Sequence, residues 1–297
     1  MLRRKSPRAG PPEKMLLGIL AFLLLFYAAR SRLPHQYEGG RASYRRDLNG
    51  ARASVYSERG CTEGESGNCS NYSHTTFLWP NGIIPYIITI DSNFTEPEEE
   101  KAKVREAMDW WENATCVQFI PTNSTSEPHL IVKLKYNTER CDALTGYRRS
   151  HTIASITLTC INGYNSVGNI AHEMGHVIGL NHEHNRADRD SFITVYHDNI
   201  LSDYERSYMK DENYDYFGTP YDLDSIMHYP PVSGDAINPS LPVFTLNDGI
   251  VFNGTIGQRK CLSYFDIVAT NRLYRCNRTT PPKTSCNFHK MYNRSEA

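Results

Sequence analysis

The order of apolar and polar positions divides this chain into a basic and apolar beginning, a polar stretch and a long region of regular strand and helix patterns. Residues 15–29 form a continuous apolar run, whereas residues 31–59 show no sustained apolar period. The first β-branched run, residues 79–90, includes the turn signal Asn81-Gly82 and predicts a strand after it. Regular structure is therefore expected from about this point onward.

Helical periodicity first appears at residues 95–114. Thr95 and Glu98 have the spacing of a capping box and predict that the helix begins there. Apolar residues recur at the spacing of one helix face and predict its buried side: Val104, Met108 and Trp111.

Further elements follow from the same patterns. Residues 129–134 and 152–158 predict two strands, because they are short runs rich in β-branched residues. Residues 167–180 and residues around 200–210 predict two helices. A last helix is expected at residues 263–276, where Ser263 and Asp266 form a capping pair.

The helix predicted at residues 167–180 carries the pattern of a metal site. His172 and His176 are four residues apart and therefore face the same side of a helix. Gly179 lets the chain turn, so that His182 returns to the same ion. Three neutral imidazoles suit Zn²⁺ and leave one position open, which is typical of catalytic zinc sites. Glu173 lies beside the metal as the candidate general base, which takes a proton from water and returns it to a leaving amine.

Two stretches resemble the astacin family of metzincin zinc proteases. The first is the extended motif of residues 172–190, H-E-M-G-H-V-I-G-L-N-H-E-H-N-R-A-D-R-D. The second is Ser225-Ile226-Met227-His228-Tyr229, which matches the S-x-M-H-Y turn of the family. The resemblance implies that Met227 forms an apolar floor beneath the zinc and that Tyr229 is a switchable zinc ligand, which swings away to stabilise the oxyanion. It also implies that Glu183 bonds, through water, to the mature N-terminus.

The resemblance covers residues 78–276 and implies an α+β fold of two lobes with a cleft between them. The N-terminal lobe would hold a mostly antiparallel sheet and two long helices, one of them the zinc helix. The C-terminal lobe would be mostly irregular, with the Met-turn and the last helix. The strand at residues 152–158 would be the edge strand that pairs with the extended substrate.

The resemblance also implies disulfide pairings among the eight cysteines. By family position, Cys116 would pair with Cys276, and Cys141 with Cys160. Pairing of Cys61 with Cys69 would give a small loop like that of hatching-enzyme-type astacins, with pairing elsewhere as the alternative, because eight cysteines allow 105 connectivities. The pairing of Cys261 with Cys286 is a guess.

The N-terminus and the N-x-S/T sequons indicate the secretory pathway. Residues 1–30 are basic and then apolar, as in a signal peptide, and the apolar run is short for crossing a hydrocarbon core of about 30 Å. A type II membrane anchor is the alternative. An even number of cysteines also favours an oxidising compartment. Eight sequons begin at Asn68, Asn71, Asn93, Asn113, Asn123, Asn253, Asn277 and Asn293.

The remaining boundaries follow from composition. Residues 31–59 are interpreted as a pro-segment, residues 60–276 as the catalytic domain, and residues 277–297 as a polar tail too short for a further domain. Many astacins silence the zinc with an aspartate in an F-x-G-D motif. The nearest match here, Tyr37-Glu38-Gly39-Gly40, lacks that aspartate, and Asp47 is a substitute candidate.

The sequence therefore predicts a secreted, extracellular zinc endopeptidase. One Zn²⁺ would be bound by His172, His176, His182 and Tyr229, with Glu173 and Tyr229 as catalytic residues. Proteins or peptides are the expected substrates. The net charge of −1 implies no nucleic-acid partner. We expect a monomer without stable membrane association, unless the apolar run is retained. A catalytically silent secreted binding protein on the same scaffold is the competing class.

Overall fold

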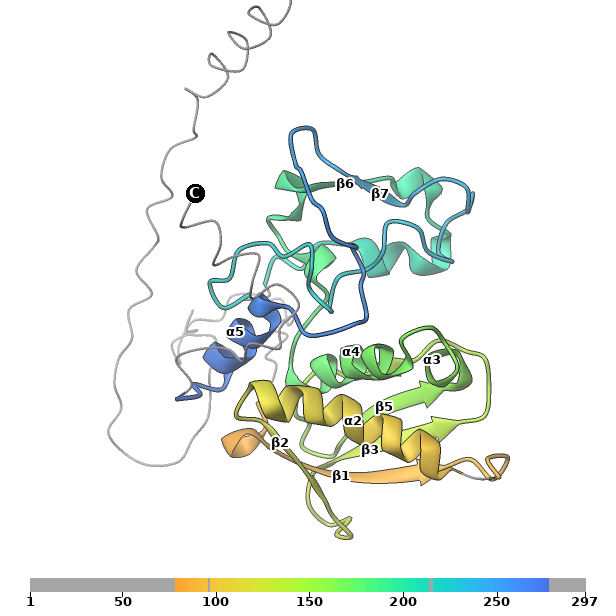
Figure 1. Cartoon of the computed structure of the whole chain (residues 1–297), viewed down its shortest axis with the longest axis vertical. Coiled ribbons are helices and arrows are strands. Elements are labelled where there is room, and N and C mark those ends of the chain that lie inside the picture. The colour runs from red at the N-terminus through yellow and green to blue at the C-terminus, as the bar shows by residue number, and fades with distance from the viewer. Residues whose placement is uncertain (1–77, 96, 214–215, 278–297) are drawn as a thin grey trace, which may run out of the picture. The chain divides into compact units, whose positions relative to one another are not determined.

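The computed structural model describes residues 78–95, 97–213 and 216–277, which form two lobes (Figure 1). The first lobe is built on a five-stranded sheet with the order β2-β1-β3-β5-β4. Helices α2 and α4 cover one face of this sheet (Figure 1). The elements of this lobe are η2 Pro80–Gly82, β1 Ile83–Ile90, α2 Glu98–Ala114, β2 Gln118–Pro121, β3 His129–Lys135, β4 Asp142–Ala143, β5 His151–Thr157, α3 Leu158–Ile161 and α4 Ser166–Ile178. The expected α+β class is confirmed.

The expectation of a mostly antiparallel sheet is wrong. β1 is parallel to β2 and β3, β3 is parallel to β5, and within this sheet the short β4 runs antiparallel to β5. The connections explain these directions. β1 and β2 are joined through α2, and parallel neighbours need a crossover of this kind. β2 pairs with the first half of β1, and β3 pairs with the second half on the other side of β1. The chain therefore passes from β2 to β3 without reversing its direction.

The strand at one edge of this sheet is β4, and not the strand predicted at residues 152–158. β5 lies between β3 and β4 and pairs with both. β4 has two residues, which is too few to give an alternating pattern in the sequence. A peptide that adds to this edge of the sheet would therefore pair with β4.

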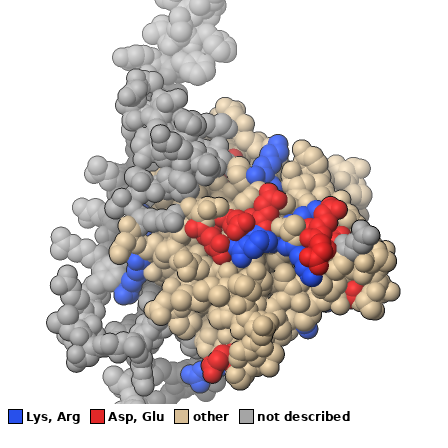
Figure 2. Space-filling model, turned by 60° about the horizontal axis from the view of Figure 1, so that its bottom comes forward, with Lys and Arg blue, Asp and Glu red and all other residues tan. Residues whose placement is uncertain are grey.

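Helix α2 begins later than predicted. Pro97 is its N-cap and provides no side-chain cap, so the capping box of Thr95 and Glu98 is wrong. A proline disfavours helical backbone at the residue before it, and the helix therefore starts beyond Pro97. The buried face agrees with the predicted apolar spacing. On the exposed face, acidic and basic side chains alternate (Figure 2) and form the ion pairs Lys101–Glu98, Lys103–Glu99, Arg105–Asp109 and Arg105–Glu112.

Two tryptophans hold α4 in the large hydrophobic core of the sheet lobe, which we call the first core. The indole of Trp79 donates a hydrogen bond of 2.8 Å to the carbonyl of Val177, and that of Trp111 donates one of 2.9 Å to the carbonyl of Ala171. Both rings are buried, and both acceptors lie on α4. The helix is thus held by directional bonds as well as by apolar packing.

The second lobe has little regular structure, as expected. A two-stranded antiparallel pair, β6 Ile193–Val195 and β7 Phe244–Leu246, is its sheet. Its own small core consists of Ile193, Ile200, Tyr208, Ala236, Val243 and Phe244. The helix predicted around residues 200–210 is a 3₁₀ helix, η6 Ser202–Tyr208. The other 3₁₀ turns are η3 Glu183–Asn185, η4 Arg189–Ser191 and η5 His197–Asn199.

The last helix, α5 Tyr264–Leu273, begins as predicted. The Ser263 hydroxyl accepts a hydrogen bond of 2.9 Å from the backbone N–H of Asp266, and the Asp266 carboxylate accepts one of 2.8 Å from that of Ser263. This reciprocal capping box confirms the capping pair. The helix packs on the core of the sheet lobe through Ile267 and Leu273, so its side chains join the first core and not the second.

Replacing Ser263 by alanine is expected to lower the free energy of unfolding by about 2 kcal/mol, the upper end for a lost cap. The hydroxyl also donates to the buried Asp222 carboxylate, which would lose that partner. The midpoint of urea unfolding measures the change. Ser202→Ala, at an exposed position of η6, is the control. Equal midpoints for the two variants would contradict the assignment.

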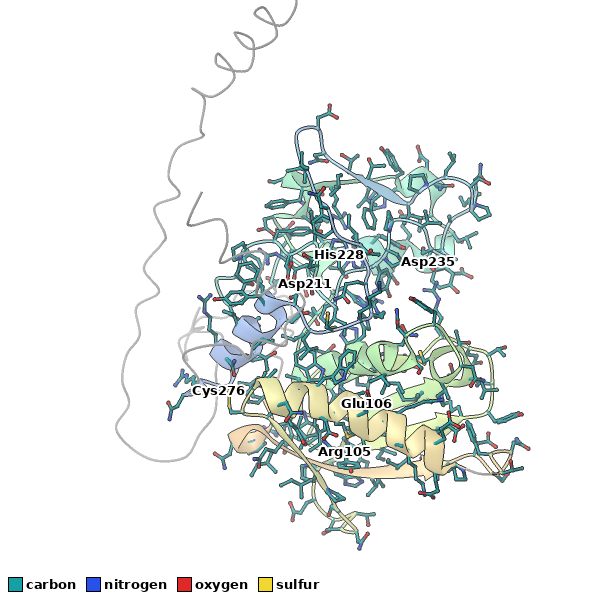
Figure 3. All side chains as sticks on the ribbon, viewed as in Figure 1. Arg105, Glu106, Asp211, His228, Asp235 and Cys276 are labelled. Carbon is teal, nitrogen blue, oxygen red and sulfur yellow. A yellow bond between two sulfur atoms is a disulfide. The ribbon has the colours of Figure 1, made fainter. Side chains whose placement is uncertain are left out.

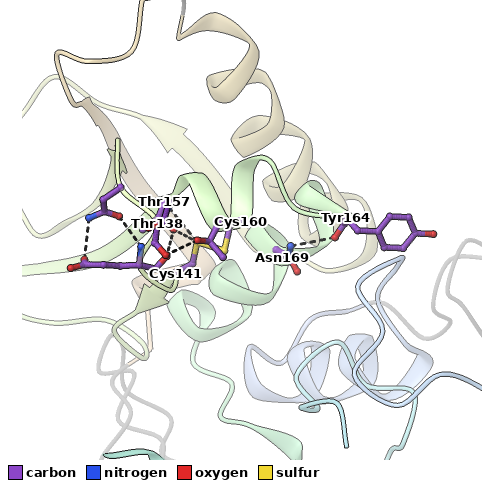
Figure 4. The surroundings of a disulfide bond; sticks show 9 residues. Thr138, Cys141, Thr157, Cys160, Tyr164 and Asn169 are labelled. Carbon is purple, nitrogen blue, oxygen red and sulfur yellow. Dashed lines mark hydrogen bonds between the residues drawn. A yellow bond between two sulfur atoms is a disulfide. The ribbon is translucent and has the colours of Figure 1, made fainter. Parts of the chain in front are cut away.

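Two disulfides confirm the pairings expected from the family. Cys116–Cys276 joins the segment after α2 to the segment after α5, and Cys141–Cys160 joins the residue before β4 to α3 (Figure 4). The pairs Cys61–Cys69 and Cys261–Cys286 involve residues outside the described part of the chain, as do the signal peptide and the pro-segment. Among the helices of the described residues, none has the length and apolarity needed to span a bilayer.

Candidate metal centre

Helix α4 ends where the metal motif requires it to end. Gly179 is the C-cap with φ of 126°, a backbone conformation that residues other than glycine rarely adopt. Gly175 has a different reason for being glycine, because an added Cβ would lie 2.5 Å from the sulfur of Met227. The two glycines thus let the chain turn towards His182 and let the methionine turn pack directly beneath the helix.

The three predicted histidine ligands converge. The Nε2 atom of His182 lies 3.2 Å from that of His172 and 3.1 Å from that of His176. A tetrahedral ion at 2.0–2.1 Å from each nitrogen corresponds to nitrogen separations of about 3.3 Å. The three side chains are also the group of possible metal ligands found among the described residues. This donor set and its spacing fit Zn²⁺.

Backbone carbonyls orient two of these imidazoles. Nδ1 of His172 lies 2.7 Å from the carbonyl oxygen of Ile226, and Nδ1 of His176 lies 2.8 Å from that of Leu180. A carbonyl accepts only, so each Nδ1 carries the proton and each Nε2 keeps its lone pair for a metal. Burial lowers the pKa of His176 to about 4 and that of His172 well below its ordinary value. Both rings therefore stay neutral at pH 7, as metal binding requires.

The methionine turn is held by the last helix. The Asp266 carboxylate accepts hydrogen bonds from the Ser225 hydroxyl at 2.6 Å and from the Ile226 N–H at 2.9 Å. The Ser225 hydroxyl in turn accepts from the N–H of Met227 at 3.0 Å. The sequence identified Asp266 only as a capping residue, and no local pattern shows that its carboxylate also builds the floor of the centre.

Tyr229 lies among the rings of the centre. Its phenol ring stacks on His184, with ring centroids 4.2 Å apart, and lies 4.4 Å from the ring of His182. Burial raises the pKa of Tyr229 to about 12, so the phenol keeps its proton at neutral pH. His184 itself is not placed as a ligand, because its Nε2 lies 3.0 Å from the carbonyl oxygen of Ser207.

Glu173 is buried beside the histidines. Burial raises its pKa to about 8, and the nearby positive charge of Arg259 opposes this shift. Arg259 donates hydrogen bonds to the carbonyls of His228 and Gln258 at 3.1 and 2.9 Å. No local pattern in the sequence places the charge of Arg259 near Glu173, since the two residues are far apart in the chain.

Glu183 lies outside the ligand set, at the wall of a small cavity that Asp222, Ser225 and Asp266 also line. Its carboxylate accepts hydrogen bonds from the Asp222 N–H at 2.8 Å and from Arg186 at 3.0 Å. Burial raises the pKa of Glu183 to about 8. The loop that follows is held by further ion pairs, since Arg186 also pairs with Asp188 and Arg189 pairs with Asp190.

A helix with two histidines and a glutamate, a third histidine beyond a glycine and a methionine turn beneath them define a metal-dependent hydrolase of the metzincin class. The model of the astacin peptidase family matches residues 71–275, and the chain therefore belongs to the astacin family. The family is zinc-dependent, and the three histidines fit that ion.

Individual relatives agree with the family assignment. The chain is 39% identical over 210 residues to human Tolloid-like protein 2, which covers 69% of this chain and 19% of that protein. It is 34% identical over 207 residues to Nematocyst expressed protein 6 of Nematostella vectensis, covering 68% of this chain and 66% of the relative. The match thus spans about a fifth of the length of the Tolloid-like relatives.

The fold is also that of a solved family structure. High choriolytic enzyme 1, a hatching enzyme zinc-protease from the medaka Oryzias latipes, superposes with a TM-score of 0.57 at 29% sequence identity. The superposition covers 69% of this chain and 98% of the fish protein.

Proposed function

We propose that this chain is a secreted, monomeric, zinc-dependent endopeptidase that hydrolyses peptide bonds within proteins. The observation that supports it most is the convergence of three Nε2 atoms next to the buried Glu173. His172, His176 and His182 would hold the ion, with Tyr229 as the switchable fourth ligand. When bound, Zn²⁺ supplies Lewis-acid chemistry, because it polarises the carbonyl that is attacked and makes water more acidic.

Glu173 is the proposed general base. Its carboxylate takes a proton from the attacking water, and the same proton is then delivered to the amine nitrogen as the carbon–nitrogen bond breaks. Burial makes this carboxylate more basic than a solvated one, which suits a group that both takes and returns a proton. The ionised form that must begin the cycle is favoured beside a divalent cation and by Arg259.

Substrate backbone is proposed to lie along β4. This strand pairs with β5 on one side and ends the sheet on the other, among the described residues. An extended peptide can pair with its backbone, which gives affinity with little demand on side chains.

Tyr229→Phe is expected to keep the fold and to lower kcat by about 10²–10³, the usual cost of losing one hydrogen-bond donor to the oxyanion. KM should change little, because the phenol acts in the transition state. Steady-state kinetics on one fluorogenic peptide measure both constants. Tyr164→Phe removes a hydroxyl from a ring that is 84% exposed and is the matched control. An unchanged kcat in Tyr229→Phe would exclude the oxyanion role.

A fluorogenic peptide assay on processed, zinc-loaded protein tests the proposed function as a whole. Hydrolysis that a chelator stops supports the endopeptidase. Intact peptides after full processing and metal loading would instead favour the silent binding protein.

Maturation is proposed to involve removal of residues 1–59. The acidic cavity beside Glu183, lined also by Asp222 and Asp266, supports a positively charged occupant such as the mature N-terminus. N-terminal sequencing of secreted protein is expected to find a start near residue 60. The upstream start is proposed because a glycan on Asn71 could not be buried, as it would have to be if the chain began near Ser70. A start found between residues 70 and 73 would contradict the proposal.

A further inference from the structure

An ion pair outside the set of proposed metal ligands connects the two lobes. Arg140, two residues before β4, pairs its guanidinium with the carboxylate of Asp235 in the second lobe. The other ion pairs among the described residues join side chains of the same lobe. In Figure 3, Asp235 lies at the side of the second lobe that faces the sheet lobe.

The acidic partner of this pair is not an ordinary surface group. The Asp235 side chain is 0% exposed, whereas that of Arg140 is 47% exposed. The second oxygen of Asp235 accepts a hydrogen bond of 2.8 Å from the Tyr208 hydroxyl. The Arg140 guanidinium also lies 4.6 Å from the centre of the Tyr204 ring. Removing one partner of a buried charged pair is strongly destabilising, because the remaining charge is left without compensation. Asp235 and the ring of Tyr204 therefore form a binding site for one arginine in the second lobe.

The arginine is held at the beginning of the edge segment, which we define as residues 140–146. The neighbouring Cys141 is fixed to α3 by its disulfide with Cys160 (Figure 4). At the other end of the segment, the N–H of Gly146 donates a 2.9 Å hydrogen bond to the carbonyl of His176, one of the proposed ligands. The edge segment therefore runs from the ion pair to the end of α4, the helix that carries His172 and His176.

Asp235 belongs to the opposite wall. It follows Tyr229 by six residues, in the stretch Tyr229-Pro230-Pro231-Val232-Ser233-Gly234-Asp235. If substrate pairs with the free edge of β4, as proposed above, it would lie between this stretch and the edge segment. Tyr229 and Asp235 are six residues apart, and an extended chain rises about 3.3 Å per residue, so the ion pair lies within about 20 Å of Tyr229, the length of about six peptide residues.

We propose that the Arg140–Asp235 pair is a latch that closes one end of the substrate channel. The proposal rests on the proposed endopeptidase function. Peptides that end before the latch bind without disturbing it, whereas a polypeptide that continues past it must separate Arg140 from Asp235. The latch therefore sets how many residues on one side of the cleaved bond are accepted freely, and it makes long substrates slower than short ones.

Peptides with one shared cleavage sequence test the latch when they are extended by about four or about eight residues on either side. In the wild-type protein, kcat/KM is expected to fall about tenfold once the extension passes the latch, and on one side of the cleaved bond only. Asp235→Asn weakens the attraction for Arg140 while its amide can still bond to Arg140 and Tyr208. It should remove most of the fall. Arg140→Met, which keeps an apolar stem over Tyr204, should do the same.

Arg149→Met is the matched control, because it removes the same charge from an exposed arginine between β4 and β5. It should keep the wild-type dependence on peptide length. The same length dependence in the wild type, Asp235→Asn and Arg140→Met would overturn the latch while leaving the endopeptidase intact. If the wild type cleaved none of the peptides, short or long, the proposed function itself would fail. Thermal unfolding of each variant verifies that the lobes remain folded.

Discussion

Glu173→Gln is expected to bind zinc as the wild type does and to lose hydrolysis, with kcat lower by about 10²–10⁴. The change removes the proton acceptor and keeps the size of a side chain that is buried in the centre. Metal content by mass spectrometry and kcat on a fluorogenic peptide are the two measurements. Glu205→Gln, at an exposed position of η6, is the control and should keep full activity. Turnover in Glu173→Gln close to that of the wild type would remove the proposed base.

The same variant has a pH-dependent effect on stability in the metal-free protein. The pKa of Glu173 is raised by folding, to about 8, so its proton stabilises the folded state at low pH. That contribution is complete below pH 4.5 and is lost as the pH rises through 8. Glutamine cannot ionise, so Glu173→Gln should gain stability relative to the wild type between about pH 5 and pH 9. Urea midpoints across this range, with chelator present, measure the difference. A constant difference would contradict burial of an ionisable carboxyl here.

Removal of the metal is the second change with a large expected effect. A chelator should abolish hydrolysis, and added Zn²⁺ should restore it, because His172, His176 and His182 form one ligand set. The metal-free protein should also unfold at a lower temperature, since the ion binds the folded state alone. Activity that survives full chelation, verified by metal analysis, would exclude metal-dependent hydrolysis.

Acid is expected to release the metal at a lower pH than it would from a site made of exposed histidines. Burial lowers the pKa of His176 to about 4, so protons compete for its Nε2 only near that pH and not near 6.5. Acid should also lower the stability of the metal-free protein, in the direction opposite to the effect of Glu173. The stabilising contribution of neutral His176 is present above pH 6.5 and is lost as the pH falls towards 4. Bound zinc should therefore be retained at about pH 6 and released near pH 4. Release already at about pH 6.5 would mean that the imidazoles are solvated.

The local parts of the centre could be predicted from the sequence because their chemistry depends on spacing along one helix. His172, Glu173 and His176 follow from the helical repeat, and Gly179 with φ of 126° explains the return to His182. Tyr229 and Met227 were found through a motif and not through geometry. Arg259 and the second role of Asp266 could not be found, since their contacts join residues far apart in the chain.

The errors in the fold have similar physical causes. Thr95 and Glu98 have the spacing of a capping box, but Pro97 stands between them and moves the start of α2. Strand direction depends on crossovers and register, which β-branched runs such as residues 129–134 do not reveal. β4 was missed because two residues carry no pattern, and the role of edge strand was assigned to its neighbour β5.

The double role of Asp266 has a consequence for how the protein is made on the ribosome. All three histidines and Glu173 have been synthesised by residue 182, yet the turn beneath them is held by a carboxylate that emerges only after residues 183–265. A nascent or prematurely terminated chain would carry the complete zinc motif without its support. We therefore expect a competent centre only once the final helix has left the ribosome and docked, which would delay proteolytic activity until translation of the domain is nearly finished.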